Sequence, residues 1–325
     1  MKAKAVRIAA HGGAEVLKIE TVDVADPGPN EVLIRHTAIG LNFQDIYQRA
    51  GFYQLPMPSG LGTEGAGVAE KVGSAVKDIK AGDRVCYAGG APGSYAEARL
   101  FPADRVIKTP VGITDEQAAA MLLKGMTAEY LLNRCYPVKA GEYVLFHAAA
   151  GGVGLVAGQW GKHLGAKMIG VAGGPEKVKL ALANGYAYCI DRNSEDVVAR
   201  VKEITGGAGV PVVYDSVGKN SFDQSLHALA PRGMFVSFGT TTGAPPPIEA
   251  GVLQKAGSLY FTRPTLVTYT AKTEDLRASA KALFDLIEKG VIKVTINQKY
   301  PLADIQQAHR DLESGHTSGS TLIEP

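Results

Sequence analysis

Cysteine is scarce in this chain of 325 residues. Cys86, Cys135 and Cys189 lie far apart, and their number is odd. This excludes a framework of paired disulfides within the chain and a Cys-x-x-Cys metal knuckle. We expect all three to be inert or buried thiols.

Long apolar runs and clusters of one charge are missing too. No run approaches the roughly 20 apolar residues that a membrane-spanning helix needs, and the Met1–Arg7 segment has no signal-peptide core. The formal net charge is +2, and Lys and Arg are spread along the chain. This gives no basic patch for nucleic acid or an anionic membrane. We expect a cytoplasmic enzyme that binds neither.

The most informative segment is Tyr143 to Gly154, an apolar run that passes into small residues and glycines before a helix-like pattern begins near Val153. This pattern predicts a strand, a tight turn and a helix start. Gly151 and Gly154 let the backbone approach a pyrophosphate, and the helix N-terminus points free N–H groups at the anion. The spacing is not the commoner Gly-x-Gly-x-x-Gly, so the following segments must support a dinucleotide site.

A second apolar strand, Lys167 to Ala172, completes a βαβ unit after a helix from Val153 to Leu164. Proteins that prefer NAD usually carry an acid at the end of this strand, and here the chain continues Gly173-Gly174-Pro175. With Lys177 and Arg192 downstream, we predict NADPH as the cofactor. An ordinary solvated cation remains an equal alternative for each of the two.

The first third of the chain is β-rich, and Gly and Pro turns separate its segments. One helix is expected at Phe43–Arg49, and Thr114-Asp-Glu-Gln117 forms a capping-box pattern that opens a helical stretch through Leu123, continued over Thr127–Cys135. The expected strands are Ala3–Ala10, Val16–Val24, Glu31–Ala38, Gly65–Val72, Asp83–Tyr87 and Ser94–Leu100.

From Gly141 onward, strands and helices alternate as in a parallel sheet covered on both faces. A helix at Glu274–Lys289 and strands at Lys293–Lys299 and Thr321–Ile323 then return to the first module. We therefore predict an α/β protein with a doubly wound Rossmann domain over residues 125–265 and a β-rich domain over 1–124 and 266–325. The six expected Rossmann strands are Tyr143–His147, Lys167–Ala172, Tyr188–Asp191, Val210–Asp215, Met234–Phe238 and Ser258–Thr262.

Along nearly its whole length the chain resembles the zinc-free quinone oxidoreductase and zeta-crystallin branch of the medium-chain dehydrogenase/reductase superfamily. The resemblance implies that the β-rich part is a GroES-like catalytic domain. The most specific match comprises Gly141-Glu142, Leu145, Ala149-Ala150-Gly151-Gly152-Val153-Gly154, Gln159 and Lys162. Further matches are Gly40-Leu-Asn42-Phe-Gln-Asp45-Ile-Tyr47-Gln-Arg49, Gly51-Phe-Tyr53, Gly62-Thr-Glu64-Gly65-Ala-Gly67-Val68 and Lys124-Gly-Met-Thr127-Ala.

Zinc-dependent relatives hold a catalytic metal at three positions where this chain has Asn42, Thr63 and, near the third, Lys124. An amide, an alcohol and an ammonium cannot replace the usual thiolates and imidazole, so we predict no metal. Without a metal to polarise a substrate oxygen, alcohol oxidation is disfavoured and an acceptor that takes hydride readily is favoured.

The resemblance implies NADPH-dependent reduction of a quinone bound in a cleft between the domains. The residues implied to line it are Asn42, Asp45, Tyr47, Tyr53, Lys124 and Thr127. Tyr47 or Tyr53 would donate to a quinone oxygen, and Thr127 or Lys124 would fix the nicotinamide. Three structural alternatives stay open: Asn42 as a helix N-cap, Tyr47 as half-buried filler and Asp45 as a residue that only orients this turn.

The cofactor contacts implied by the resemblance are Thr127, Gly151, Gly152, Val153, Gly154, Gly173, Lys177, Arg192, Val217, Gly218, Phe238 and Gly239. The chain departs from relatives at two points, where Arg192 replaces a frequent Tyr and Gly315-His316 replaces an upstream Arg. The phosphate contacts are therefore expected to be rebuilt around Arg192. Gly218 and Gly239 equally suit plain tight turns.

Four other expectations stay open. The nearest alternative enzyme is an NADPH-dependent reductase of α,β-unsaturated aldehydes or ketones, and electrons could pass singly instead of as hydride. An RNA-binding or structural crystallin-type role is the alternative from another class, disfavoured by the lack of basic and aromatic clusters. Finally, the apolar Leu259-Tyr-Phe261 segment within Gly257–Arg263 predicts a homodimer formed through an edge strand.

Overall fold

The computed structural model describes every residue, Met1–Pro325. The chain divides into two compact units. The first unit comprises Met1–Met126, Thr270–Lys289 and Val294–Pro325, and the second comprises Thr127–Tyr269 and Gly290–Lys293. The boundaries predicted from the sequence, after residues 124 and 265, lie a few residues earlier in the chain.

The first unit contains two sheets. The larger has seven strands in the order β15-β16-β3-β5-β6-β8, with β7 paired to β3, and the smaller has the order β2-β1-β4. The strands are β1 Lys2–Ile8, β2 Lys18–Asp23, β3 Glu31–Leu41, β4 Ser59–Gly60, β5 Glu64–Val72, β6 Arg84–Ala88, β7 Ala98–Pro102, β8 Ile107–Lys108, β15 Ile296–Pro301 and β16 Ser320–Glu324.

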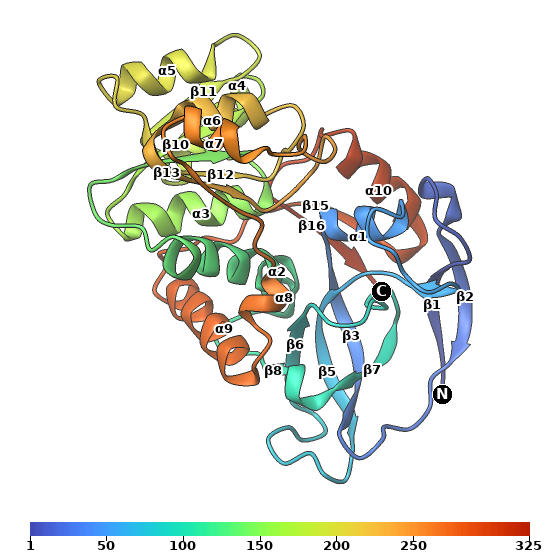
Figure 1. Ribbon diagram of the computed structural model, residues 1–325. Helices are drawn as coiled ribbons and strands as arrows, with labels where there is room; N and C mark the ends of the chain where they lie inside the picture. Colours follow the sequence, from blue (N-terminus) through green and yellow to red (C-terminus); the bar gives the residue numbers. More distant parts are fainter. The chain divides into compact units, whose positions relative to one another are not determined.

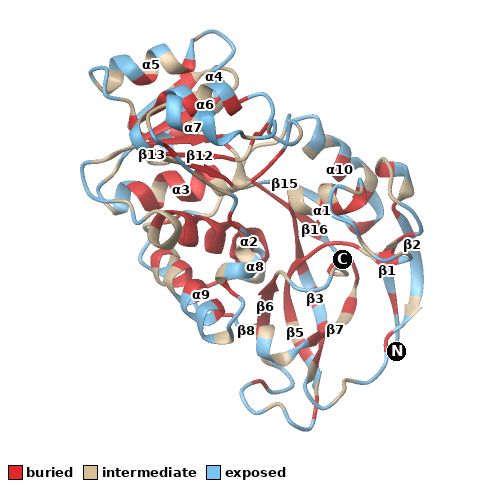
Figure 2. Cartoon of the chain, viewed as in Figure 1, coloured by how far each residue is buried: buried red, intermediate tan, exposed pale blue.

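Most pairings in these sheets are antiparallel, and β15 with β16 is the parallel exception. Buried apolar side chains such as Ile39, Ile323 and Val85 fill the core. Figure 2 shows β3, β5 and β6 largely in the colour of buried residues. The sheet therefore provides a rigid base for the loops and helices at its ends.

Two predicted strands of this unit are displaced. The expected strand Lys293–Lys299 begins three residues later, at Ile296, and ends at Pro301. The expected strand Ser94–Leu100 begins four residues later, at Ala98, and extends to Pro102. Tyr95 instead donates its backbone N–H to Leu61, and Ala96 forms only an isolated bridge with Ala5. The short strands β4 and β8 were not predicted, because two-residue strands leave no alternating pattern in a sequence.

The second unit confirms the predicted doubly wound sheet. Its six strands are all parallel and follow the order β11-β10-β9-β12-β13-β14. Figure 1 shows α3 on one side of β12 and β13, with α6 and α7 on the other. The strands are β9 Tyr143–His147, β10 Lys167–Ala172, β11 Tyr188–Asp191, β12 Val210–Asp215, β13 Leu229–Ser237 and β14 Tyr260–Thr262.

Helices alternate with these strands, and α3 starts at Gly152, one residue before the predicted start. Right-handed crossovers place α3 and α4 on one face of the sheet and α5, α6 and α7 on the other. The helices of the chain are α1 Phe43–Arg49, α2 Asp115–Tyr130, α3 Gly152–His163, α4 Pro175–Ala183, α5 Val197–Ile204, α6 Phe222–Ala228, α7 Ala250–Lys255, α8 Leu266–Tyr269, α9 Thr273–Glu288 and α10 Ile305–Glu313.

Helix α2 joins the two predicted helical segments without a break but ends at Tyr130, and the rest of the second segment, Leu131–Cys135, forms a π-helical turn. Gly125 lies inside α2, where any added Cβ would collide with Leu283 of α9. The glycine therefore permits close helix packing at the cost of some helix propensity.

The structure describes the state of the three cysteines and the apolar character of the helices. All three cysteines are free, and burial raises the pKa of Cys86 to about 12, which keeps this thiol protonated. None of the ten α-helices combines the length and apolarity required to cross a bilayer.

Candidate functional site

The predicted cofactor residues of the second unit, Thr127 apart, follow or lie close after the carboxyl ends of its parallel strands. The glycine turn follows β9, Gly173 follows β10 and Arg192 follows β11. Val217 and Gly218 lie just beyond β12, and Phe238 and Gly239 directly follow β13. Because the strands are parallel, their carboxyl ends share one edge of the sheet, where doubly wound folds bind ligands.

The glycine turn after β9 is shaped for close approach of an anion. Ala148 adopts a left-handed conformation with φ of 53°, and Gly151 donates its N–H to the Ala148 carbonyl at 2.9 Å. A Cβ on Gly154 would collide with the Ala148 carbonyl and lie 2.6 Å from that of Ala149. Only glycine fits at this position, and the turn leads into α3 with its N-terminal N–H groups free for a pyrophosphate.

Lys177 and Arg192 interact with each other and lie in the segments that follow β10 and β11. The Arg192 guanidinium lies against Gly173, where an added Cβ would be 3.0 Å from Nη2. Burial and then the charge of Arg192 lower the pKa of Lys177. Two neighbouring cations are suited to the recognition of a phosphate.

Asp191 lies at the end of β11, next to Arg192 in the chain, and its carboxylate is bound by backbone groups. Its Oδ1 accepts the backbone N–H groups of Gly174 at 2.8 Å and Asn193 at 3.0 Å. These two hydrogen bonds lower the pKa of Asp191. The carboxylate therefore joins the N-terminus of α4, through Gly174, to the turn after β11, through Asn193.

Asp215, at the end of β12, was not among the predicted site residues. It is buried, and its Oδ1 accepts the N–H groups of Val217 at 2.7 Å and Gly218 at 3.1 Å. The Ser225 hydroxyl donates to Asp215 Oδ2 at 2.5 Å and lies 3.0 Å from His147 Nε2. Burial opposes ionisation, yet His147 and the donated hydrogen bonds keep the pKa of Asp215 below its ordinary value. Asp215 thus holds the backbone of Val217 and Gly218, which are two of the predicted cofactor-binding residues.

In the first unit, helix α1 carries three predicted residues. Asn42 is its N-cap, as the structural alternative for this residue anticipated, and its backbone N–H donates to Asp45 Oδ2 at 2.9 Å. The Asn42 side chain is also engaged, because Nδ2 donates to Glu64 Oε2 at 2.8 Å. Asn42 therefore combines the capping position with a contact outside its own helix.

Glu64 joins Asn42 to Lys124, although it was not predicted as a site residue. It is completely buried, and its Oε2 lies 3.3 Å from Lys124 Nζ. Its Oε1 accepts the Leu123 backbone N–H at 2.7 Å. The sequence signal was present in the Gly62-Thr-Glu64 match, but the partners of this carboxylate could not be inferred from it.

Asp45 lies in a second buried contact set of the first unit. The Tyr95 hydroxyl donates to Asp45 Oδ2 at 2.8 Å, and Thr63 donates to Oδ1 at 3.3 Å. Tyr95 in turn lies 3.2 Å from Nε2 of the buried His309. Burial raises the pKa of Asp45 to about 7, despite the hydrogen bonds that favour its charged form.

Tyr47 and Tyr53 belong to an aromatic group with Phe43 and Phe52. The Tyr47 ring centroid is 5.5 Å from that of Tyr53 in an edge-on arrangement, and 6.0 Å from Phe43 and Phe52. Phe52 is 54% exposed and Tyr53 43% exposed. Exposed rings grouped in this way offer an apolar surface with phenol hydroxyls, which suits a planar ligand.

The three positions at which zinc-dependent relatives bind metal hold other contacts. Asn42 and Lys124 both bond to Glu64, and Thr63 bonds to Asp45. Nowhere in the chain do three or more His, Cys, Asp or Glu side chains gather in a way that could hold a metal ion. Thr127, the remaining predicted residue, is buried on α2 and is the first residue of the second unit.

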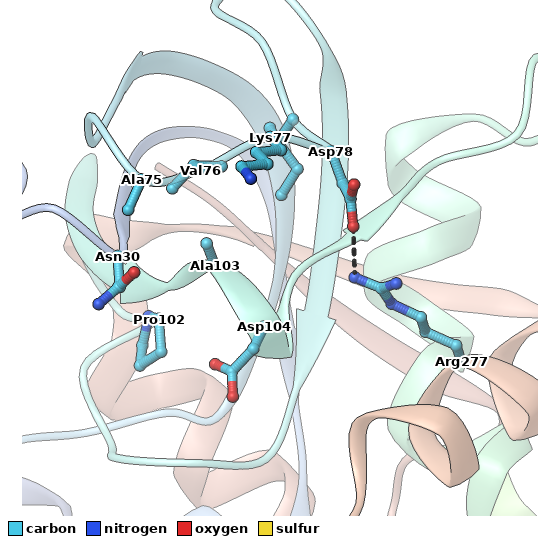
Figure 3. Close-up of a pocket in the computed structure, with 10 residues that line it drawn as sticks. Asn30, Ala75, Val76, Lys77, Asp78, Pro102, Ala103, Asp104 and Arg277 are labelled. Carbon is cyan, nitrogen blue, oxygen red and sulfur yellow. Dashed lines mark hydrogen bonds and ion pairs between the residues drawn. The ribbon is translucent and has the colours of Figure 1, made fainter.

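A surface pocket of the first unit contains none of the predicted residues. Figure 3 shows Asn30, Lys77 and Asp104 around it, with Arg277 donating to Asp78 at 3.2 Å. The charged groups of opposite sign in the lining are partly paired with each other. The pocket therefore lacks a set of groups that would select one ligand charge.

Two family models match the chain. Residues 28–111 match the alcohol dehydrogenase GroES-like domain, and residues 152–289 match the zinc-binding dehydrogenase model. The first match confirms the predicted GroES-like domain class. The second carries zinc in its description, whereas Asn42, Thr63 and Lys124 of this chain do not provide zinc ligands.

Full-length relatives are also similar. A quinone oxidoreductase of Pseudomonas aeruginosa is 50% identical over 99% of this chain and 100% of its own. Quinone oxidoreductase 1 of Escherichia coli is 51% identical over 97% of both chains. The crystal structure of Escherichia coli quinone oxidoreductase complexed with NADPH has a TM-score of 0.98 at 50% identity, covering 99% of this chain and 100% of that one.

Proposed function

The chain belongs to the zinc-free quinone oxidoreductase branch of the medium-chain dehydrogenase/reductase superfamily, and from that premise we propose that it reduces quinones with NADPH and without a metal ion. The observation that carries the cofactor assignment is the pair of cations, Lys177 and Arg192, beside a glycine turn that has no acid at the end of β10.

In this proposal the second unit binds NADPH, which supplies hydride. Gly151, Gly152, Val153 and Gly154 bind the pyrophosphate through backbone N–H groups. Lys177 and Arg192 bind the 2′-phosphate, which removes their mutual repulsion. The remaining proposed contacts are Thr127, Gly173, Val217, Gly218, Phe238 and Gly239.

Side chains of the first unit bind the quinone. A quinone accepts a hydride, and a proton from solvent or from the protein. The product is an aromatic hydroquinone, so the reduction requires no Lewis acid. The protein needs mainly to hold the ring and donate hydrogen bonds to its oxygens. The aromatic group around Tyr47 and Tyr53 supplies the apolar surface and hydroxyl donors, and Lys124 supplies a cation, with Asn42 and Asp45 completing the proposed set.

The proposal extends to location and assembly. The proposed location is the cytoplasm. Strand β14 pairs only with β13, and Tyr260 on this edge strand is 61% exposed. An exposed apolar edge is poorly tolerated in water, which supports a homodimer formed through β14. Gel filtration with light scattering should give the dimer mass, and a monomer at micromolar concentration would refute this assembly.

The function is tested with a panel of acceptors. After exhaustive chelation, the enzyme should oxidise NADPH with 1,4-benzoquinone or 9,10-phenanthrenequinone much faster than with 2-alkenals. A preference for the alkenals would instead support the reductase of α,β-unsaturated carbonyl compounds. Loss of quinone turnover on chelation, restored by added zinc, would contradict the proposal.

A further inference from the structure

Glu64 has surroundings that a merely structural carboxylate does not require. It lies at the start of β5 and has no exposed surface. Its side chain accepts hydrogen bonds from three donors: the Asn42 amide, the Leu123 backbone and the Lys124 ammonium. Two of these donors are residues that we place at the quinone.

The neighbouring strand β3 provides space for the Glu64 carboxylate. Gly40 of β3 is paired in register with Glu64 of β5. A Cβ on Gly40 would collide with Glu64 Oε2 and with the Ala119 carbonyl. The missing side chain at Gly40 therefore lets the carboxylate lie against the strand backbone, within reach of both Asn42 and Lys124.

The two oxygens of Glu64 have separate partners. Oε1 accepts the Leu123 N–H at 2.7 Å, which fixes the plane of the carboxylate against the backbone of α2. Oε2 accepts from Asn42 Nδ2 at 2.8 Å and Lys124 Nζ at 3.3 Å. Because Nδ2 is used in this way, Oδ1 of the Asn42 amide faces the Asp45 backbone N–H in the capping box of α1, and Lys124 keeps further N–H groups to donate.

We propose that Glu64 is a positioning residue for quinone reduction, which sets the direction of the Asn42 amide and the place of the Lys124 ammonium. The inference rests on the proposed function. Lysine has many rotamers and an amide can turn over, so a fixed acceptor is needed to hold both in one geometry. A buried carboxylate makes that geometry strongly preferred, because the low local dielectric penalises any unpaired alternative.

Glu64→Gln changes this arrangement by replacing Oε2 of the carboxylate with an NH2 group. With Oε1 retained for Leu123, the new NH2 group faces two donors, Asn42 Nδ2 and Lys124 Nζ. The Asn42 amide should turn over and the ammonium should be displaced. We expect kcat/KM for the quinone to fall at least about tenfold, mostly through kcat, with the NADPH Kd changed less than about threefold.

A second substitution should restore the acceptor pattern. When Asn42→Asp is combined with Glu64→Gln, the carboxylate introduced at position 42 accepts from the amide introduced at position 64 and pairs with Lys124. Its other oxygen takes the place of Asn42 Oδ1. Asn42→Asp alone instead places two carboxylates in contact and should be strongly impaired. The double variant should therefore exceed N42D in kcat/KM by at least about threefold. This comparison also applies if E64Q alone does not fold.

The matched control is Glu129→Gln, which removes another buried carboxylate that pairs with a cation, Arg134, at 2.7 Å. It should lower Tm and leave kcat/KM unchanged. Three results would each overturn the positioning role while the wild type remains active. These are an unchanged kcat/KM in folded E64Q, no gain from E64Q in the N42D background, and an equal loss of kcat/KM in E129Q. A wild type without quinone turnover would overturn the proposed function and this inference with it.

Discussion

In the second unit most candidate residues follow strand ends, and most of the proposed cofactor contacts are backbone groups. In the first unit the side chains of Asn42 and Lys124 both bond to the carboxylate of Glu64, from strand β5. The glycine turn needs only the local chain, since Gly151 and Ala148 contact each other across three residues. The Glu64 set joins positions that are 22, 59 and 60 residues apart. Local backbone sites and long-range side-chain sites should therefore respond differently to substitution.

The largest effect is expected at the glycine turn. Gly154→Val places atoms against two backbone carbonyls that cannot move away. We expect NADPH binding to weaken more than about 100-fold, with a loss of about 1–3 kcal/mol in the free energy of unfolding. Fluorescence titration and thermal unfolding measure both.

The control for this substitution lies in the same unit. Gly251 on α7 has open space around any added Cβ. Gly251→Ala should leave NADPH binding unchanged and be neutral or stabilising by about 0.5–1 kcal/mol. If both variants bind NADPH equally well, the close approach at Gly154 is not part of the cofactor site.

The second effect concerns charge in the same unit. Lys177→Glu should weaken NADPH binding roughly 100-fold and spare NADH, because it places an anion where the 2′-phosphate is proposed to bind. Lys179→Glu, on the exposed part of the same helix, should change neither. Competitive titration of both nucleotides tests this, and equal weakening of NADH and NADPH by K177E would show that Lys177 is not a phosphate ligand.

The third effect tests the buried network of the first unit through pH. The pKa of Asp45 is raised to about 7 by burial, so folding favours its protonated form. Its contribution to stability is fully present below a pH of about 4 and is lost as the pH rises through about 7. Between pH 5 and 8 the wild type should lose about 2 kcal/mol more than Asp45→Asn. Parallel pH dependences in urea unfolding would contradict this account.

The smallest effect is expected at the exposed aromatic group. Tyr53→Phe keeps the ring and its edge-on contact with Tyr47 but removes one hydroxyl donor. We expect kcat to fall roughly tenfold or less, equivalent to about 1.4 kcal/mol, with KM nearly unchanged. Steady-state kinetics with 9,10-phenanthrenequinone measures it, and an unchanged kcat would assign the donor role to another residue.

The difference between local backbone sites and long-range side-chain sites also explains which features the sequence could predict. Strands β9 to β12 were predicted with their observed bounds, because buried parallel strands leave short apolar runs in the sequence. Glu64 and Tyr95 were missed as site residues, since their partners lie far away in the chain and no local pattern records them. Asn42 and Lys124 came only from the family resemblance, which named the residues but not the carboxylate that joins them.

The central claim is tested most directly by single-turnover kinetics of chelated enzyme with NADPH that carries deuterium at the transferred position. Direct hydride transfer to a quinone predicts that oxidation of the nucleotide is slower with deuterium and needs no added metal. The account would be contradicted if the rate were the same with hydrogen and deuterium under conditions where chemistry limits turnover. It would also be contradicted if NADPH were oxidised only when zinc is supplied.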